Sequence, residues 1–193
     1  MRRSSCEYTS CYCEENVYLL CKQLCQPPLS QSVEKAWAIW ISNENKTVAV
    51  WRQGGGGRAY DEEGLAVWDY HVICAVKYQD RSPVIYDLDT TLPFPSPLQA
   101  YIRRAFRPQA SIRSSFRPRF RVVEARQYLE NFSSDRSHML KAGGGGEFVA
   151  KPPSYPCILR ASGENNVMKF ADMCDLTMPG VVVDLPSLVS ALR

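Results

Sequence analysis

The sequence predicts one α/β domain of the α+β type over residues 1–193, a mainly antiparallel sheet flanked by helices. Three observations predict this class. Apolar runs of strand length recur along the chain and are separated by short polar loops, a pattern that favours antiparallel pairing. Segments with helical spacing lie near both ends and between the strands. The 193 residues show no internal repeat, and 45% of them are hydrophobic, which suits a single domain with a sizeable core.

The first predicted helix covers residues 14–25. Its apolar residues recur at helical spacing, and two glutamates occupy its first turn, where the helix dipole favours negative charge. Two consecutive prolines follow and end it. The apolar runs 36–42 and 47–51 come next. The polar residues 43–46 between them predict a hairpin.

The runs 68–78 and 83–88 predict a second hairpin, because both are strand-like and only the polar residues 79–82 separate them. Further along, the patterns predict a short helix, a strand, a helix and a closing helix, at residues 98–106, 120–124, 125–132 and 185–192. The four-glycine tracts at 54–57 and 143–146 predict loops rather than domain linkers.

The charge balance is too small to argue for a nucleic-acid-binding protein by itself. Lysine and arginine number 23 and aspartate and glutamate 20, so the net charge is only +3. Seven arginines nevertheless lie between residues 103 and 121 with no acid among them. A basic face for phosphates is therefore an alternative to an ordinary solvated surface. No apolar run approaches the roughly 18 residues of a membrane helix, and no export signal is evident. We expect a cytoplasmic or nuclear protein.

Cys13 is the first candidate for chemistry among eight cysteines. It directly precedes the predicted helix, where unpaired backbone N–H groups and the dipole would stabilise a thiolate and lower the pKa of the thiol. The ordinary alternative is a buried, inert cysteine. Cys11, two residues earlier, is expected to point the other way. A zinc site built from Cys11, Cys13, Cys21 and Cys25 is a rival interpretation, but their spacing suits a tetrahedral site poorly.

His71 and Asp87 are the other two candidates. Each lies in a different strand of the second predicted hairpin, and side chains along a strand alternate between its faces. If the hairpin turn contains an odd number of residues, His71 and Asp87 share a face. With an even number they lie on opposite faces. Asp89 has the same parity as Asp87 and competes with it. Cysteine, histidine and aspartate together would supply a nucleophile, a base and a group that orients the base.

Several segments carry a resemblance to a known family. They are CYCEEN (11–16), ISNE (41–44), WDYHV (68–72), YDLDTTLPFP (86–95), FRVV (120–123), NFSSDRSHM (131–139) and PPSYPCI (152–158). In this order they resemble the N-terminal glutamine amidohydrolase family, which is known for its WDYHV motif. The resemblance implies that Cys13, His71 and Asp87 form the catalytic triad. It also implies a core similar to papain-like and transglutaminase-like cysteine enzymes.

The implied activity converts an N-terminal glutamine of a protein to glutamate and releases ammonia through a thioester. The product would feed the N-degron pathway, in which an arginyltransferase acts next. The resemblance implies a monomer without metal or organic cofactor, whose partners are protein or peptide substrates rather than membranes or nucleic acid. A cysteine peptidase or a transglutaminase-like enzyme with the same triad is the rival that residue chemistry alone leaves open.

Recognition of a chain terminus requires a group that meets the free α-ammonium. Glu14, Glu15, Asp69 and Asp89 are near the triad in sequence, and we prefer Glu15 because it belongs to the CYCEEN motif. Trp68, Asp89 and Phe94 are further candidates for substrate binding.

His138 has two interpretations. It could border the substrate groove and contribute to binding, or it could be a surface residue beside a local Asp135–Arg136 pair.

Overall fold

The computed structural model describes residues 1–54, 61–143, 145–161 and 163–193. Six strands form one sheet in the order β6-β5-β4-β1-β7-β8, and every neighbouring pair is antiparallel. These strands are β1 (Val33–Ser42), β4 (His71–Tyr78), β5 (Val84–Tyr86), β6 (Ser96–Pro97), β7 (Arg119–Glu124) and β8 (Val181–Val183). A second, two-stranded sheet pairs β2 (Val48–Val50) with β3 (Ala66–Trp68). The predicted α+β class is confirmed.

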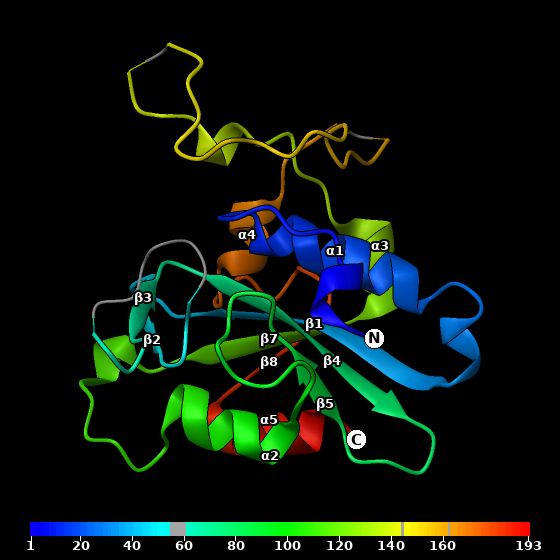
Figure 1. Cartoon of the computed structure of the whole chain (residues 1–193). Helices are drawn as coiled ribbons and strands as arrows, with labels where there is room; N and C mark the ends of the chain where they lie inside the picture. The colour runs from blue at the N-terminus through cyan, green and yellow to red at the C-terminus, as the bar shows by residue number, and fades with distance from the viewer. Residues whose placement is uncertain (55–60, 144, 162) are drawn as a thin grey trace.

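Helices cover both faces of the large sheet (Figure 1). On one face lie α1 (Cys13–Leu24), α3 (Ala125–Asn131) and α4 (Val167–Ala171), and on the other α2 (Leu98–Tyr101) and α5 (Leu185–Ala191). A π-helical segment, Ile102–Phe106, continues α2. Short 3-10 turns occur at Arg3–Ser5, Leu29–Gln31, Ser114–Phe116 and Ser137–Met139. No helix within the described ranges is both long and apolar enough to cross a membrane.

The alternating side chains of β1 divide the interior into two cores, one on each face of the sheet. Ala38 and Trp40 pack with residues of α1, α3 and α4. Ile39 and Ile41 pack with residues of α2 and α5. Because all four side chains are fully buried, β1 is the central strand against which both layers of helices pack.

Trp40 organises the core under α1. Its ring stacks on Phe170 of α4 at 5.3 Å between centroids, and it also contacts Tyr70, Tyr128 and Phe132. The hydroxyl of Tyr128 donates to the backbone carbonyl of Glu14 at 3.1 Å. The aromatic cluster therefore holds the first turn of α1 in place against the sheet.

The first predicted hairpin is wrong. Strands β1 and β2 follow each other in sequence but lie in different sheets. The side chain of Asn43 explains the change of direction. Its amide oxygen accepts from the N–H groups of Asn45 and Thr47, and its amide nitrogen donates to the carbonyls of Ser115 and Arg117. The turn is thus tied to a distant segment, and β2 leaves β1.

The predicted strand 68–78 is also interrupted. β3 ends at Trp68 in the small sheet, and β4 begins at His71 in the large one. The carbonyl of Asp69, between them, accepts a hydrogen bond from the Ser42 hydroxyl at 2.6 Å. This break places His71 at the first position of β4, at the end of the sheet.

The remaining predictions agree with the structure to within one or two residues at each boundary. They comprise the first helix, the β4–β5 hairpin, the short helix, strand β7, α3 and the closing helix α5. Strands β6 and β8 and helix α4 were not predicted. Residues 55–57 of the first glycine tract and residue 144 of the second lie outside the described residues.

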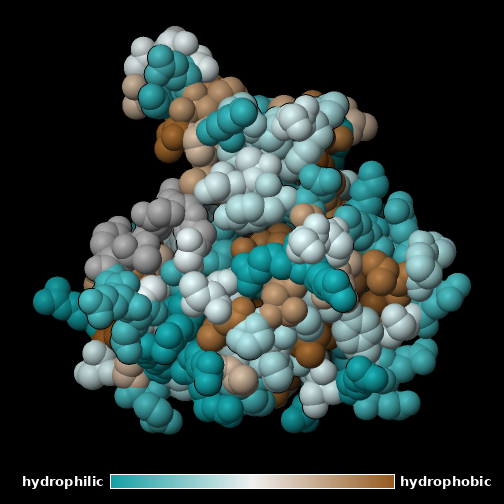
Figure 2. All heavy atoms as spheres, viewed as in Figure 1, coloured by the Kyte–Doolittle hydropathy of each residue, from teal (hydrophilic) through white to brown (hydrophobic). Residues whose placement is uncertain are grey.

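The run of seven arginines is not one uniform surface patch. Arg121 is completely buried and donates only to backbone carbonyls, those of Phe170, Asp172, Asp175 and Met178. Arg107 pairs with Glu63 at 2.7 Å and lies over the ring of Trp51. The other five, at 103, 104, 113, 117 and 119, are exposed. Figure 2 shows hydrophilic residues gathered over the part of the surface where α2 lies.

We expect Arg121→Met to destabilise the fold by about 3–5 kcal/mol, because several buried carbonyls lose their donor at about 1–3 kcal/mol each. Methionine keeps an unbranched chain but cannot donate. Urea denaturation measures the loss. Arg119→Met, an exposed neighbour, is the matched control and should change stability by no more than about 0.5 kcal/mol. An Arg121→Met variant as stable as the wild type would contradict the structural role of this arginine.

Candidate active site

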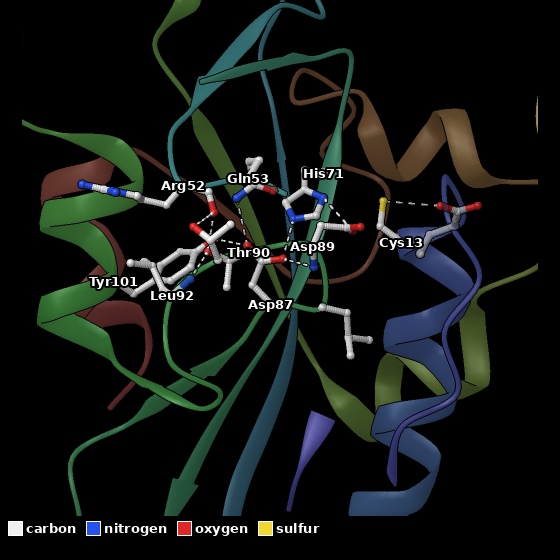
Figure 3. Close-up of polar contacts among 12 residues, drawn as sticks. Cys13, Arg52, Gln53, His71, Asp87, Asp89, Thr90, Leu92 and Tyr101 are labelled. Carbon is white, nitrogen blue, oxygen red and sulfur yellow. Dashed lines mark hydrogen bonds and ion pairs between the residues drawn. The ribbon is translucent and has the colours of Figure 1, made fainter. Parts of the chain in front are cut away.

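Three elements bring Cys13, His71 and Asp87 to one end of the large sheet (Figure 3). Cys13 is the first residue of α1, His71 is the first residue of β4, and Asp87 directly follows β5. Their exposed fractions are 6%, 0% and 1%. The site is therefore almost completely shielded from water, which strengthens every charge interaction inside it.

The turn between β4 and β5 decides the question of register that the sequence left open. Cys74 pairs with Tyr86 and Ala75 with Ile85, so the turn has an odd number of residues. His71 and Asp87 therefore share one face. Nε2 of His71 lies 2.9 Å from Oδ1 of Asp87, a buried hydrogen bond.

Asp87 is held by donors from several elements. Gln53 and Tyr101 donate to Oδ2 at 3.1 and 2.8 Å, and the backbone N–H of Asp89 donates to Oδ1 at 3.0 Å. Burial alone would raise the pKa of Asp87. The charge of His71 and the hydrogen bonds outweigh burial, so the pKa lies below its usual value. Sequence reasoning missed Gln53 and Tyr101, because nothing in their local pattern distinguishes them.

The hydrogen bond to Asp87 determines which nitrogen of His71 can act as a base. A carboxylate only accepts, so Nε2 carries a proton and Nδ1 is the basic nitrogen. Within the described part of the chain, Nδ1 has no hydrogen-bond partner, and its nearest carboxylate oxygen, on Asp89, is 4.0 Å away. Burial favours a lower pKa for His71, but the carboxylate of Asp87 outweighs it and the pKa is raised.

The sulfur of Cys13 lies against the start of β4. The backbone N–H of Val72, the residue after His71, acts to lower the pKa of its thiol. The sequence predicts a lowered pKa for this thiol at a helix N-terminus, and that prediction is wrong. Burial raises the pKa of Cys13 well above its usual value, and the negative charges of Glu14 and Asp89 raise it further. Desolvation here exceeds the effect of the dipole, so the thiol needs a base to react.

Glu14 and Glu15 are both buried, but their environments differ. Glu15 forms an ion pair with Arg136, with Nη2 2.8 Å from Oε2, and accepts from the hydroxyl of Ser134. Glu14 has its Oε2 3.6 Å from the sulfur of Cys13, which donates to it. The structure thus brings Glu14 to the proposed nucleophile and leaves Glu15 bound within the protein.

His138 reaches the site, with Nε2 3.3 Å from Oε1 of Glu14. The expected local pair between Asp135 and Arg136 is wrong. Arg136 turns to Glu15 instead, and Asp135 accepts from the backbone N–H of Ser137.

The other predicted binding residues differ in how close they lie to the three candidate catalytic residues. Trp68 stacks on the imidazole of His71, with 4.9 Å between ring centroids. Asp89 accepts from the hydroxyl of Tyr8 at 2.6 Å. Phe94 contacts the ring of Tyr86 and lies under the guanidinium of Arg3.

The structure gives the zinc interpretation no support. Among the described residues, the one group of three or more potential ligands consists of His71, Asp87 and Asp89 and contains no cysteine. Cys11 has a positive φ of 69°, and its sulfur lies 3.7 Å from the hydroxyl of Ser10.

Comparison with known proteins extends this picture. The chain is 41% identical over 190 residues to the protein N-terminal glutamine amidohydrolase of Bos taurus, covering 97% of this chain and 87% of that protein. The protein of the same name from Homo sapiens is 41% identical over 174 residues, 89% and 80% of the two chains. The protein of this name from Arabidopsis thaliana is 41% identical over 160 residues, which cover 81% of this chain and 70% of that protein.

A family model described as N-terminal glutamine amidase matches residues 8–192, nearly the whole chain. The resemblance carried by the sequence motifs is thereby confirmed. With a family match of this extent and relatives aligned over most of their length, the chain belongs to the N-terminal glutamine amidase family.

Proposed function

We propose that this protein hydrolyses the side-chain amide of an N-terminal glutamine in proteins and peptides, giving glutamate and ammonia. Membership of the family makes the chain an amide hydrolase. One observation carries the proposal: a buried hydrogen bond orients His71 on Asp87, and Cys13 lies on the other side of the imidazole (Figure 3), in a chain 41% identical to proteins named for this activity.

In the first step Cys13 is the nucleophile and His71 its base. Because burial keeps the thiol protonated, Nδ1 of His71 takes its proton as the sulfur attacks the amide carbon. The oxygen of that carbon becomes negatively charged. The first hydrogen bond of α1 runs from the N–H of Asn16 to the carbonyl of Tyr12, so the N–H groups before it are placed to stabilise this charge.

The imidazolium of His71 then gives its proton to the amide nitrogen, the carbon–nitrogen bond breaks, and ammonia leaves. The sulfur and the former amide carbon remain joined as a thioester. Water gives a proton to Nδ1 and attacks the thioester carbon. The sulfur departs, recovers the proton and leaves a glutamate side chain. Asp87 keeps Nε2 protonated throughout, so every transfer uses Nδ1.

Enclosure of the site favours a chain end over an internal segment. Because Cys13 is only 6% exposed, a continuous polypeptide would have to pass through packed protein, whereas a terminal residue can enter from one side. This supports the amidohydrolase over a cysteine peptidase or a transglutaminase with the same three residue types. We place the reaction in the N-degron pathway of the cytoplasm or nucleus, before an arginyltransferase, and carried out by the monomer.

Cys13→Ala should abolish ammonia release from a Gln-initiated peptide, because no other group replaces the sulfur. A coupled ammonia assay measures this. Cys11→Ala is the matched control and should retain the activity. Mass spectrometry of the peptide separates deamidation from cleavage of the chain, which would indicate a peptidase. Release that persists in Cys13→Ala would assign the nucleophile to another residue.

Asp87→Asn should lower kcat by about 10²–10⁴-fold, because the amide no longer holds His71 in the reactive tautomer. The acid limb of kcat/KM should also move to lower pH. The carboxylate raises the pKa of His71, so without it the imidazole loses its proton, and becomes a base, at a lower pH.

The pH profile of kcat/KM measures both effects. The matched control is Asp80→Asn, an exposed position in the turn of the same hairpin where asparagine tolerates the positive φ of 55°. Its profile should be unchanged. An Asp87→Asn enzyme whose acid limb stays in place would contradict the assigned role of Asp87.

A further inference from the structure

Glu14 is a buried charge that the proposed reaction steps do not use. Its side chain is completely inaccessible, and within the described residues Oε1 has no hydrogen-bond partner. The thiol of Cys13 donates to the carboxylate, and the carboxylate raises the pKa of the neighbouring Tyr70, but neither Cys13 nor Tyr70 is a cation. His138 lies 3.3 Å from Oε1, yet neither of its nitrogens makes a hydrogen bond there. A buried carboxylate without a bonded cation is costly.

Glu15, the next residue, is a buried carboxylate whose hydrogen bonds are all supplied by the protein. Glu15 has the guanidinium of Arg136 on both oxygens, at 2.8 to 3.3 Å, and a further donor in Ser134. Two adjacent buried glutamates thus differ in one respect: the protein supplies a hydrogen-bonded cation to Glu15 and none to Glu14. The missing partner of Glu14 is a cation with N–H donors.

We propose that the carboxylate of Glu14 binds the α-ammonium group of the substrate's terminal residue, beside His138, whose Nε2 lies 3.3 Å from Oε1 of Glu14. The inference rests on the proposed function and names the group that recognises the free chain end. An ammonium supplies the charge and the donors that Oε1 lacks.

The distances allow one glutamine to reach both groups at once. In glutamine, four bonds separate the amide carbon from the α-nitrogen, a span of about 5 Å when extended. Oε2 of Glu14 lies 3.6 Å from the sulfur of Cys13. The amide carbon can therefore sit at the sulfur while the ammonium sits at the carboxylate.

Because the substrate must reach both the Cys13 sulfur and the Glu14 carboxylate, binding depends on a free α-ammonium and on the length of the side chain. An internal glutamine has a neutral amide in place of the ammonium and leaves Glu14 buried without a cation. An N-terminal asparagine is one methylene shorter, so an ammonium held at Glu14 draws its amide carbon about 1.2 Å back from the sulfur. Both substrates fail for geometric and electrostatic reasons that do not depend on pocket volume.

Binding of the amine also affects the nucleophile. In the free protein the thiol of Cys13 donates to Glu14. The acids whose charges act on that thiol are Glu14, Asp69 and Asp89, and after burial the charge of Glu14 contributes most to its raised pKa. His71 lies beside the thiol (Figure 3). An ammonium on Glu14 offsets that charge and competes for its oxygens, which turns the thiol proton toward His71. The correct substrate thus promotes its own attack.

The test compares two peptides that differ only in the α-amino group, a Gln-initiated peptide and its des-amino analogue. Calorimetry with Cys13→Ala protein measures binding without turnover. The amine peptide should bind about 10- to 100-fold more tightly than the analogue. Adding Glu14→Gln, which is isosteric, should remove that difference. Adding Glu14→Asp, which keeps the charge, should restore part of it.

Glu15→Gln on the same background is the matched control and should keep the full preference for the amine, with thermal unfolding verifying that each variant folds. A preference that survives Glu14→Gln would overturn the assignment of Glu14. Absence of binding by either peptide to Cys13→Ala would overturn it as well. Failure of the proposed function is seen separately, as no ammonia release by the wild-type protein from the Gln-initiated peptide.

Discussion

The hydrogen bond between His71 and Asp87 is the interaction on which the rest of the site depends. At 2.9 Å and out of contact with water, it sets the tautomer of the imidazole and leaves Nδ1 as the basic nitrogen. A buried carboxylate requires further donors. These come from Gln53, which follows the small sheet's first strand, and from Tyr101 in α2. One acid–base pair therefore joins the hairpin, the second sheet and the helix on the opposite face of the large sheet.

The proposed nucleophile is positioned by core packing rather than by its own loop. Trp40 and its aromatic neighbours fill the space beneath α1, and Tyr128 binds the carbonyl of Glu14 at the helix start. The sulfur of Cys13 is thereby held against the first residues of β4. Burial has an electrostatic consequence, because it raises the pKa of the thiol against the influence of the helix dipole. A site of this kind needs a base close by and gains from any cation that enters with the substrate.

The two buried glutamates at the start of α1 have different roles: Glu15 stabilises the fold, and Glu14 recognises the substrate. The pair of Glu15 with Arg136 links α1 to the segment after α3 and satisfies both groups internally. Glu14 has the same chemistry and is equally buried, but it has no hydrogen-bonded cation among the described residues. Placed 3.6 Å from the sulfur of Cys13, its charge makes the enclosed site selective for a positively charged chain end. A short distance between two anchors then accounts for both terminal and side-chain specificity.

Local patterns in the sequence determined the helix that begins at Cys13, the hairpin of β4 and β5, and the residue types of a cysteine–histidine–carboxylate site, since helical spacing, strand alternation and turn composition are properties of neighbouring residues. Tertiary structure alone decided that the turn between β4 and β5 has an odd number of residues, and that β1 and β2 belong to different sheets after the change of direction at Asn43. It also decided that Arg121 lies inside the protein. It also decided that Gln53 and Tyr101 meet Asp87, and that Glu15 rather than Glu14 receives Arg136. The physical reason is that desolvation and hydrogen-bond pairing depend on which groups distant parts of the chain bring together. The pKa of a carboxylate or thiol, and its ability to bind a substrate cation, depend on whether the fold supplies it with a partner.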